Sequence, residues 1–188
     1  MTDTAGNHID EGIAAGPAVL LLSNNGSVAL RTKAGALLRA STLGEFFDPV
    51  RDRSANPFGI RTLYDQRSQR FFAVAAERGG GANCSSQPGT CYSRLLLAVS
   101  RSHSPGSLTG ADWHFFSLDA TTDNGVRTEM WADYPSLAVT PDSVVIAMQM
   151  FPFTPPGVEP TADSKVLKIR ILDKSRILEG LASPHAIS

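Results

Sequence analysis

Three oxygen-bearing side chains stand close together in the segment DATTDNG, which covers residues 119–125. Asp119, Asp123 and Asn124 carry the carboxylate and amide oxygens that Ca²⁺ prefers, usually about six to eight of them on a flexible loop. Their spacing differs from that of the helix-loop-helix calcium motif, and no Glu lies where that motif requires one. The segment is therefore either a calcium site or an ordinary polar loop.

A second candidate site is the group Trp131, Asp133 and Tyr134, which comes directly before an apolar run. Asp133 can accept hydrogen bonds from a ligand or contact a cation, and Trp131 can stack on the face of a sugar ring. The alternative is the start of a strand, where Asp133 would accept hydrogen bonds from backbone amides. We predict that this group binds a ligand.

Asp65 and Arg70 flank a polar segment between two apolar runs, with Ser68 between them. Asp and Ser side chains commonly hydrogen-bond backbone amides in such turns, which favours a turn with a local ion pair. The alternative is a role for Asp65 and Arg70 in ligand binding.

Cys84 and Cys91 bracket the segment SSQPGT in a single loop. The loop can bring their Cα atoms within bridging distance, so we predict a disulfide, which fits an oxidising compartment. The alternative is two free thiols. A metal pair is disfavoured because no second Cys pair or nearby His completes a tetrahedral set.

Motifs of known catalytic chemistry are not found in the sequence. The four histidines, His8, His103, His114 and His185, show no ligand spacing. There is no Gly-x-Ser-x-Gly elbow, phosphate-binding loop or His-Glu-x-x-His. A retaining glycosidase needs two carboxylates about 5 Å apart, and the sequence does not say which carboxylates meet. We therefore assign no catalytic residue.

The elements that must position these residues are short strands, because apolar runs alternate with segments rich in Gly, Pro and Asn. The run RLLLAV is apolar at successive positions, which is typical of a strand buried on both faces. Asn25-Gly26 favours a hairpin turn with positive φ. Short helical turns are expected near 43–47 and in DKSRILEGLA. The predicted strands are about 18–23, 27–32, 36–40, 60–65, 70–77, 93–101, 112–118 and 165–172, with a hairpin over 131–151 that turns at 140–143.

The strand pattern repeats, because RTLYDQRSQRFFAVAAE and WADYPSLAVTPDSVVIAMQMF are similar units a little over seventy residues apart. Repeated antiparallel four-stranded units predict an all-β fold made of β-propeller blades, each covering the face of the next. The predicted blade-like units are about 1–48, 56–120 and 131–180. These are about two and a half blades, which is an incomplete propeller. The alternative is a β-sandwich.

Composition limits the classes of partner. The chain has 188 residues, 42% hydrophobic and 19% charged, which is long and apolar enough for one ordinary domain with a core. A formal net charge of -1 with no basic stripe argues against nucleic acid as a partner. No apolar window is long enough for a membrane-spanning helix. The start, MTDTAGNHIDEG, lacks the features of a signal peptide, so we expect either a cytosolic protein or further residues upstream.

Four segments resemble a family of mostly secreted bacterial β-propeller proteins of uncharacterised function, with sialidase-like propeller architecture. They are LYDQRSQRFF, LLLAVSRSHSP followed by DWHFFSLD, WADYPSLAVTPDSVVIAMQMF, and KIRILDKSRILEG. The resemblance implies a propeller fold and an extracellular or cell-surface location. Gly59-Ile60 stand where the family has Asp-Pro, which argues against a full ring of acidic residues. TTDNGVRT partly matches the aspartate box of sialidase-like propellers, with Arg127-Thr128 in place of its aromatic end.

We therefore expect a non-enzymatic extracellular or surface β-propeller segment that binds a carbohydrate or a protein. One alternative is a fragment of a sialidase-like or other glycoside-hydrolase propeller, and another is a blade module that associates with itself. The partners would be a ligand and either the missing blades or a second copy, with no cofactor other than the calcium considered above. The predicted ligand-binding residues are Asp133, Tyr134, Trp131, Asp65 and Arg70.

Overall fold

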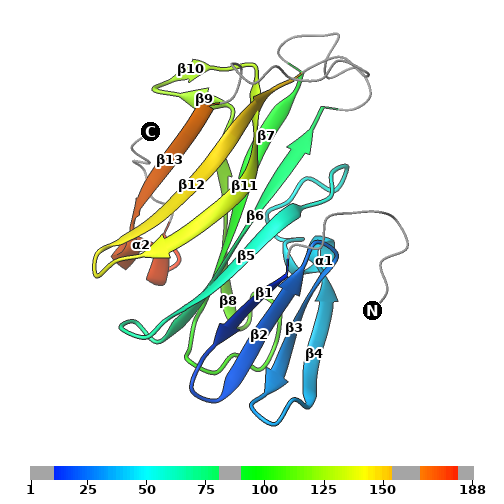
Figure 1. Cartoon of the computed structure of the whole chain (residues 1–188), viewed down its shortest axis with the longest axis vertical. Helices are drawn as coiled ribbons and strands as arrows, with labels where there is room; N and C mark the ends of the chain where they lie inside the picture. The colour runs from blue at the N-terminus through cyan, green and yellow to red at the C-terminus, as the bar shows by residue number, and fades with distance from the viewer. Residues whose placement is uncertain (1–10, 81–89, 154–165, 182–188) are drawn as a thin grey trace.

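The structure is a computed structural model that describes residues 11–80, 90–153 and 166–181. It is built almost entirely of antiparallel β-strands, which form three sheets and one short hairpin (Figure 1). The all-β prediction is confirmed, and each predicted strand is present with ends that differ by a few residues. In this part of the chain, no helix is long and apolar enough to cross a membrane.

The first sheet has four strands in chain order: β1 (Gly12–Ala15), β2 (Val19–Asn24), β3 (Ser27–Thr32) and β4 (Leu37–Thr42). The β2–β3 turn lies at Asn25-Gly26 as predicted, but neither residue has positive φ. Instead, Oδ1 of Asn24 accepts hydrogen bonds from the backbone N–H groups of Gly26 and Ser27, at 2.9 and 2.8 Å. This side-chain acceptor stabilises the turn without a left-handed residue. Strand β1 was not predicted, because a strand of four residues is too short to show a clear alternation of apolar and polar residues.

A single-turn helix, α1 (Leu43–Phe46), leads from the first sheet to the second, as expected. Thr42 and Glu45 form a capping box at its start. The helix buries Phe46, and Phe47 follows it into the same core. The connector is therefore held by hydrogen bonds at the capping box and by the burial of two phenylalanine rings.

The second sheet contains β5 (Phe58–Asp65), β6 (Arg70–Gly79), β7 (Tyr92–Ser100) and β8 (Trp113–Asp119), again in chain order. Its central strands β6 and β7 are buried on both faces, as the apolar run RLLLAV predicts. The reason is the position of this sheet between the two others.

The third sheet has three strands, β11 (Met130–Val139), β12 (Ser143–Pro152) and β13 (Val166–Asp173). A hairpin of β9 (Thr122–Asp123) and β10 (Val126–Arg127) precedes it, and the helix α2 (Lys174–Leu178) follows it. Helix α2 agrees with the expected helical turn, whereas the two-residue strands β9 and β10 were not predicted.

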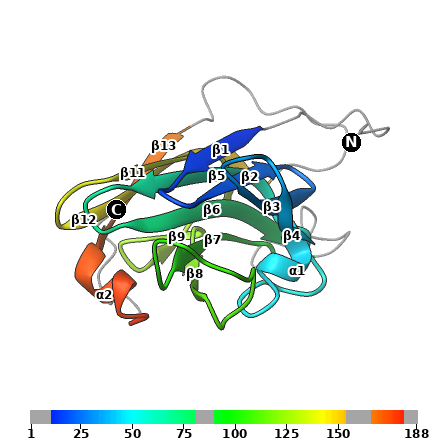
Figure 2. The same cartoon turned by 90° about the horizontal axis from the view of Figure 1, so that it is seen from below.

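Two apolar cores lie between the sheets, one in each interface. One joins the first and second sheets through side chains such as Leu21, Leu30 and Phe71. The other joins the second and third sheets through side chains such as Val74 and Ile146. The first strands of the sheets, β1, β5 and β11, lie next to one another along one side of the stack (Figure 2).

The second and third sheets share an irregularity at the same point. Two residues of β5, Gly59 and Ile60, stand between the pairs that β5 makes with β6, and the register shifts there. Two residues of β11, Tyr134 and Pro135, produce the same shift against β12. Both Gly59 and Tyr134 have positive φ, of 64° and 48°. The structural repeat therefore extends to a matching bulge in each first strand.

Candidate functional site

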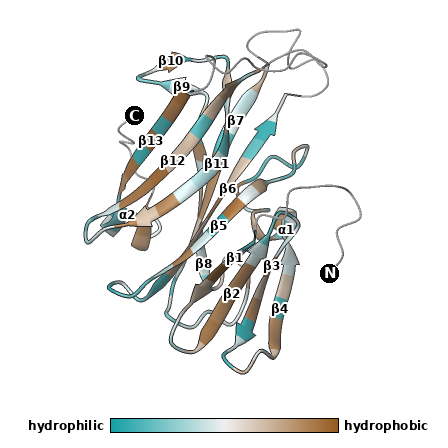
Figure 3. Cartoon of the chain, in the orientation of Figure 1, coloured by the Kyte–Doolittle hydropathy of each residue, from teal (hydrophilic) through white to brown (hydrophobic). Residues whose placement is uncertain are grey.

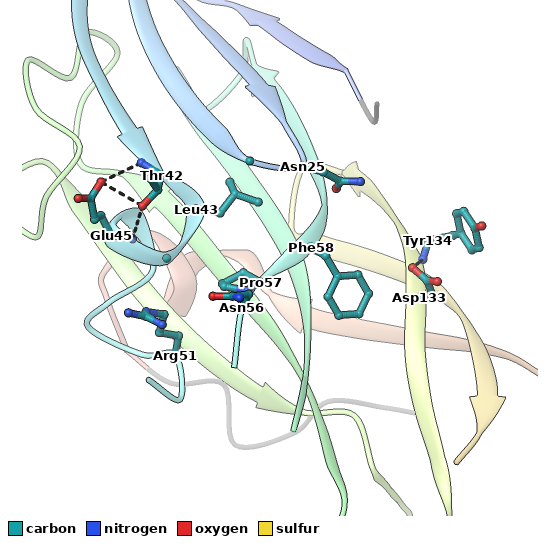
Figure 4. Close-up of a pocket in the computed structure, with 12 residues that line it drawn as sticks. Asn25, Thr42, Leu43, Glu45, Arg51, Asn56, Pro57, Phe58, Asp133 and Tyr134 are labelled. Carbon is teal, nitrogen blue, oxygen red and sulfur yellow. Dashed lines mark hydrogen bonds between the residues drawn. The ribbon is translucent and has the colours of Figure 1, made fainter. Parts of the chain in front are cut away.

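The main candidate site is a pocket of about 720 Å³ at the meeting point of all three sheets (Figure 4). The β2–β3 turn, the connector around α1, the start of β5 and the bulge of β11 form its wall. The lining residues are Asn25, Gly26, Thr42, Leu43, Gly44, Glu45, Arg51, Asn56, Pro57, Phe58, Asp133 and Tyr134. Two of the residues predicted from the sequence, Asp133 and Tyr134, are among them.

The bulge in β11 gives Asp133 and Tyr134 their positions. Oδ1 of Asp133 accepts a hydrogen bond from the backbone N–H of Tyr134 at 2.7 Å. Tyr134 has a φ of 48° and is 49% exposed, so a bulky side chain is held in a left-handed conformation at the surface. Such a conformation costs about 1–2 kcal/mol for a residue with a Cβ atom. Strain of this kind at an exposed aromatic residue is commonly found at binding sites.

The strain at Tyr134 can be measured with two substitutions. Tyr134→Ala and Tyr134→Gly both remove the ring, and only Gly adopts positive φ without cost. We expect the Gly variant to be more stable than the Ala variant by about 1 kcal/mol, in urea unfolding. In a regular strand the order would be reversed, because Gly weakens strands. An Ala variant at least as stable as the Gly variant would contradict the left-handed conformation.

The bulge in β5 supports the opposite side of the pocket. The backbone N–H of Gly59 donates a hydrogen bond to Oδ1 of Asn25 at 2.7 Å. A Cβ atom on Gly59 would lie 3.2 Å from Cδ of Pro135 in the neighbouring bulge. Glycine is therefore favoured here both by its φ and by the close approach of β11. The turn of the first sheet and the bulges of the other two are thus held together.

Aromatic side chains form one half of the site. Phe58 lines the pocket, and its ring lies 6.1 Å from that of Trp131 in an edge-to-face contact. Trp131 itself stacks on Phe151 at 5.1 Å, and the guanidinium of Arg78 lies 4.2 Å from its ring centre. Trp131 therefore packs against Phe58 but is not itself among the residues that line the pocket. The rings that line the pocket are those of Phe58 and Tyr134.

Polar side chains form the other half. In Figure 4, Asn56 and Arg51 lie on one side of Phe58, and Asp133 projects from β11 on the other. Oε2 of Glu45 accepts hydrogen bonds from N and Oγ1 of Thr42, at 2.9 and 3.0 Å. These hydrogen bonds lower the pKa of Glu45, and the one from the backbone of Thr42 has the larger effect. Glu45 is thus a carboxylate at neutral pH and serves as an acceptor.

The segment that carries Arg51 is anchored to a buried carboxylate. Glu77 is fully buried, and its Oε1 accepts a hydrogen bond from the backbone N–H of Asp52 at 2.9 Å. Burial raises the pKa of Glu77, while the Asp52 hydrogen bond and the charge of Arg94 oppose that effect. Arg51 also donates to the carbonyl oxygen of Ala55 at 3.2 Å. Its guanidinium is therefore positioned by its own loop.

Asp65 and Arg70 are not part of this pocket. Asp65 accepts hydrogen bonds from N and Oγ of Ser68, which confirms the predicted turn. Its ion pair, however, is with Lys174 of α2, at 2.7 Å, and the predicted local pair with Arg70 is wrong. Arg70 instead donates to the carbonyl oxygens of Ser68 and Gln69. The cation comes from more than one hundred residues away, which no local pattern reveals.

The DATTDNG segment is occupied by protein cations. Asp123 forms an ion pair with Lys168 at 2.6 Å, and Arg170 lies 3.8 Å from the same oxygen. Oδ1 of Asp119 accepts a hydrogen bond from the backbone N–H of Thr121 at 2.8 Å. Asn124 has positive φ in the turn of the β9–β10 hairpin. Across residues 11–80, 90–153 and 166–181, no three His, Cys, Asp or Glu side chains form a group that could hold a metal.

Of the two cysteines, only Cys91 lies within the described residues. It is buried, and its carbonyl oxygen accepts a hydrogen bond from Arg127. Cys84 lies outside them, so the disulfide between Cys84 and Cys91 stays a prediction.

Sequence reasoning missed the half of the pocket that comes from the first sheet and the connector. Asn25 was interpreted only as a turn residue, and Asn56, Phe58, Glu45 and Arg51 were not identified. The sequence held one signal for this half of the pocket. Gly59-Ile60 stand where the resembled propeller family has Asp-Pro, and Phe58 directly precedes them. Searches against protein-family models, curated proteins and solved structures find no match for this chain.

Proposed function

We propose that this protein is a binding module and that the pocket between Phe58 and Tyr134 takes a carbohydrate. The observation that carries the proposal is the combination of two accessible aromatic rings with planar polar groups around one pocket of about 720 Å³. A sugar has an apolar face of C–H groups and a rim of hydroxyls. Aromatic rings suit the face, and carboxylate, amide and guanidinium groups suit the rim.

The polar groups favour binding rather than hydrolysis. A general acid that cleaves a glycosidic bond needs a raised pKa, so that it holds a proton near neutral pH. The pKa of Glu45 is instead lowered by its hydrogen bonds to Thr42. Glu45 is therefore better suited to accept hydrogen bonds from hydroxyl groups than to donate a proton to a leaving group.

We also propose a fold and a location for the protein that carries this pocket. We place the three sheets as blades of an extracellular or surface β-propeller, with the disulfide of Cys84 and Cys91 as a stabilising link. The supporting facts are the repeated sheets, the matching bulges and the side-by-side first strands. In a propeller, first strands line the central channel, where ligands commonly bind.

Glycan-array screening followed by calorimetry tests the carbohydrate proposal. We expect Asp133→Asn to weaken binding of the best ligand by about fivefold, because a hydrogen bond to a charged group, worth about 1.5–3 kcal/mol, is replaced by one to a neutral amide, worth about 0.5–1.5 kcal/mol. Phe58→Ala should weaken it by a similar factor through the lost ring contact. Asp142→Asn is the matched control, since Asp142 is an exposed turn aspartate of the same sheet outside the pocket.

Two results would overturn this function. One is the failure of the protein to bind any glycan on the array. The other is a glycan affinity that neither Asp133→Asn nor Phe58→Ala changes, which would place the site elsewhere. Release of reducing sugar from the bound glycan would replace the binding module by the glycoside-hydrolase alternative.

A further inference from the structure

The third sheet carries large apolar side chains on the face that points away from the rest of the protein. In β13, Lys168, Arg170 and Leu172 are buried, and the alternate residues Leu167, Ile169 and Ile171 are exposed, Leu167 by 69%. Figure 3 shows this alternation of hydrophobic and hydrophilic residues along β13. Because successive side chains of a strand point to opposite faces, the exposed apolar residues share the outer face. Their partners in β12 include Val145 and Ala147.

In the second sheet, the face that corresponds to this outer face of the third sheet is covered by another sheet. At the matching place of its third strand, β7, stand Leu95, Leu97 and Val99, which are buried against the third sheet. The match follows from the bulges, because Val74 and Ala147 are the first paired residues after the register shift in each sheet. Val74 pairs with Leu97, and Ala147 pairs with Ile169. The outer face of the third sheet thus repeats a face that, one sheet earlier, is covered by another sheet.

The opposite end of the stack is the outer face of the first sheet, where apolar side chains lie beside polar ones such as Ser27 and Arg31. In the first sheet, Ala14, Leu21 and Leu30 point into the core. The alternate residues Ile13, Leu22 and Ala29 stand opposite one another on the outer face, and Ile13 is 65% exposed. This outer face corresponds to the side of the second and third sheets that packs against the preceding sheet in the stack.

We propose that these two faces bind each other between copies of this chain, with the first sheet of one copy packed on the third sheet of the next. The contact would repeat the sheet-on-sheet packing that the chain already makes twice within itself. It is a head-to-tail contact, since two different surfaces meet. Both surfaces lie on every copy, so a second copy supplies a complementary face without any further component. This inference does not depend on the carbohydrate proposal.

Two blocking variants test both the contact and its polarity. Leu167→Asp places a charge on the third-sheet face, and Ile13→Asp places one on the first-sheet face. We expect the unaltered protein to form a defined oligomer in light scattering after size exclusion, and each variant alone to be monomeric. An equimolar mixture of the two variants should form one heterodimer, because each supplies the face that the other lacks, and native mass spectrometry identifies it.

The controls separate this result from its alternatives. Val126→Asp is the matched control, because Val126 is 68% exposed but lies in the β9–β10 hairpin, outside both faces, and it should leave the oligomer intact. Near-UV circular dichroism checks that the monomeric variants are folded, and Leu167→Lys provides a second block with the opposite charge.

Three outcomes would overturn the proposal. The first is an unaltered protein that stays monomeric up to about 100 μM, far above the Kd of a stable dimer. The second is an Ile13→Asp variant that still dimerises, which would mean that two third-sheet faces pair symmetrically. The third is a mixture of the blocking variants that stays monomeric. Glycan binding by a monomeric protein would leave the proposed function standing while rejecting the contact between copies.

Discussion

The Asp65→Asn variant is expected to lose about 3 kcal/mol of unfolding free energy, because it leaves the ammonium group of Lys174 buried without its counter-ion. Lys174 is only 3% exposed, and its Nζ donates to Oδ2 of Asp65 at 2.7 Å and to the carbonyl oxygen of Thr140 at 2.8 Å. One side chain therefore joins the β5–β6 turn, the β11–β12 turn and α2. Asn keeps an acceptor for the turn amides, so the substitution isolates the loss of charge.

A double-mutant cycle checks that the effect belongs to the pair. Lys174→Met should cost about 2 kcal/mol, since Asp65 keeps its hydrogen bonds from Ser68. The double variant should lose less than the sum of the two, because no unpaired charge remains buried. Arg70→Met is the matched control, as Arg70 is a cation beside the same turn that does not pair with Asp65, and it should change stability by less than about 0.5 kcal/mol. A large effect at Arg70 would contradict this assignment.

The same pair gives the stability a defined dependence on pH. Burial acts to raise the pKa of Asp65, but hydrogen bonds from Lys174 and Ser68 outweigh it and lower the pKa to about 2. A carboxyl group with a depressed folded pKa stabilises the protein above its unfolded pKa of 3.8, and that contribution is lost as the pH falls toward 2. Urea midpoints of the unaltered protein and of Lys174→Met should therefore differ most at neutral pH and converge over this acidic range.

The Phe46→Ala variant is expected to lose about 4 kcal/mol, because it empties the centre of the core between the first and second sheets. The Phe46 ring is fully buried and meets the rings of Phe47, Trp113 and Phe115 edge to face, at 4.9, 5.2 and 5.3 Å. Removal of the ring leaves a cavity among three rigid neighbours, which relax little. The change in urea midpoint measures this loss.

The control for Phe46 lies in the adjoining first sheet. Leu37 is exposed, and Leu37→Ala should change stability by less than about 0.5 kcal/mol. Trp113 packs against Phe46, so its fluorescence in the folded Phe46→Ala variant should shift as water or neighbouring groups approach the indole. A loss below about 1.5 kcal/mol would show that α1 is not part of the cooperative core.

The elements of this protein could be predicted from its sequence because their signals are local. The run RLLLAV, apolar at successive positions, indicated a strand buried on both faces, and β7 is one. Asp65 and Ser68 indicated a turn that the structure confirms. Strand β1 and the β9–β10 hairpin were missed because two to four residues are too few for an alternating pattern.

The candidate site could be predicted only in part. Asp133 and Tyr134 were found because an aromatic and an acidic residue stand together before a strand. Asn25, Glu45 and Arg51 were not found, because what brings them to the same pocket is the packing of the first sheet and its connector against the β5 bulge.

By itself, the sequence determined the all-β class, the strand positions, the helical turns and the repeat of similar units, since hydrophobic periodicity and turn residues act over a few neighbours. Only the tertiary structure decided which charges pair and which residues meet. Asp65 forms its ion pair with Lys174, and Asp123 forms its ion pair with Lys168. The reason is that a partly buried charge pairs with the cation that the packing of distant segments places beside it. In the same way, Tyr134 has its left-handed φ at the bulge where the register of β11 on β12 shifts, and that bulge is set by the pairing of the two strands.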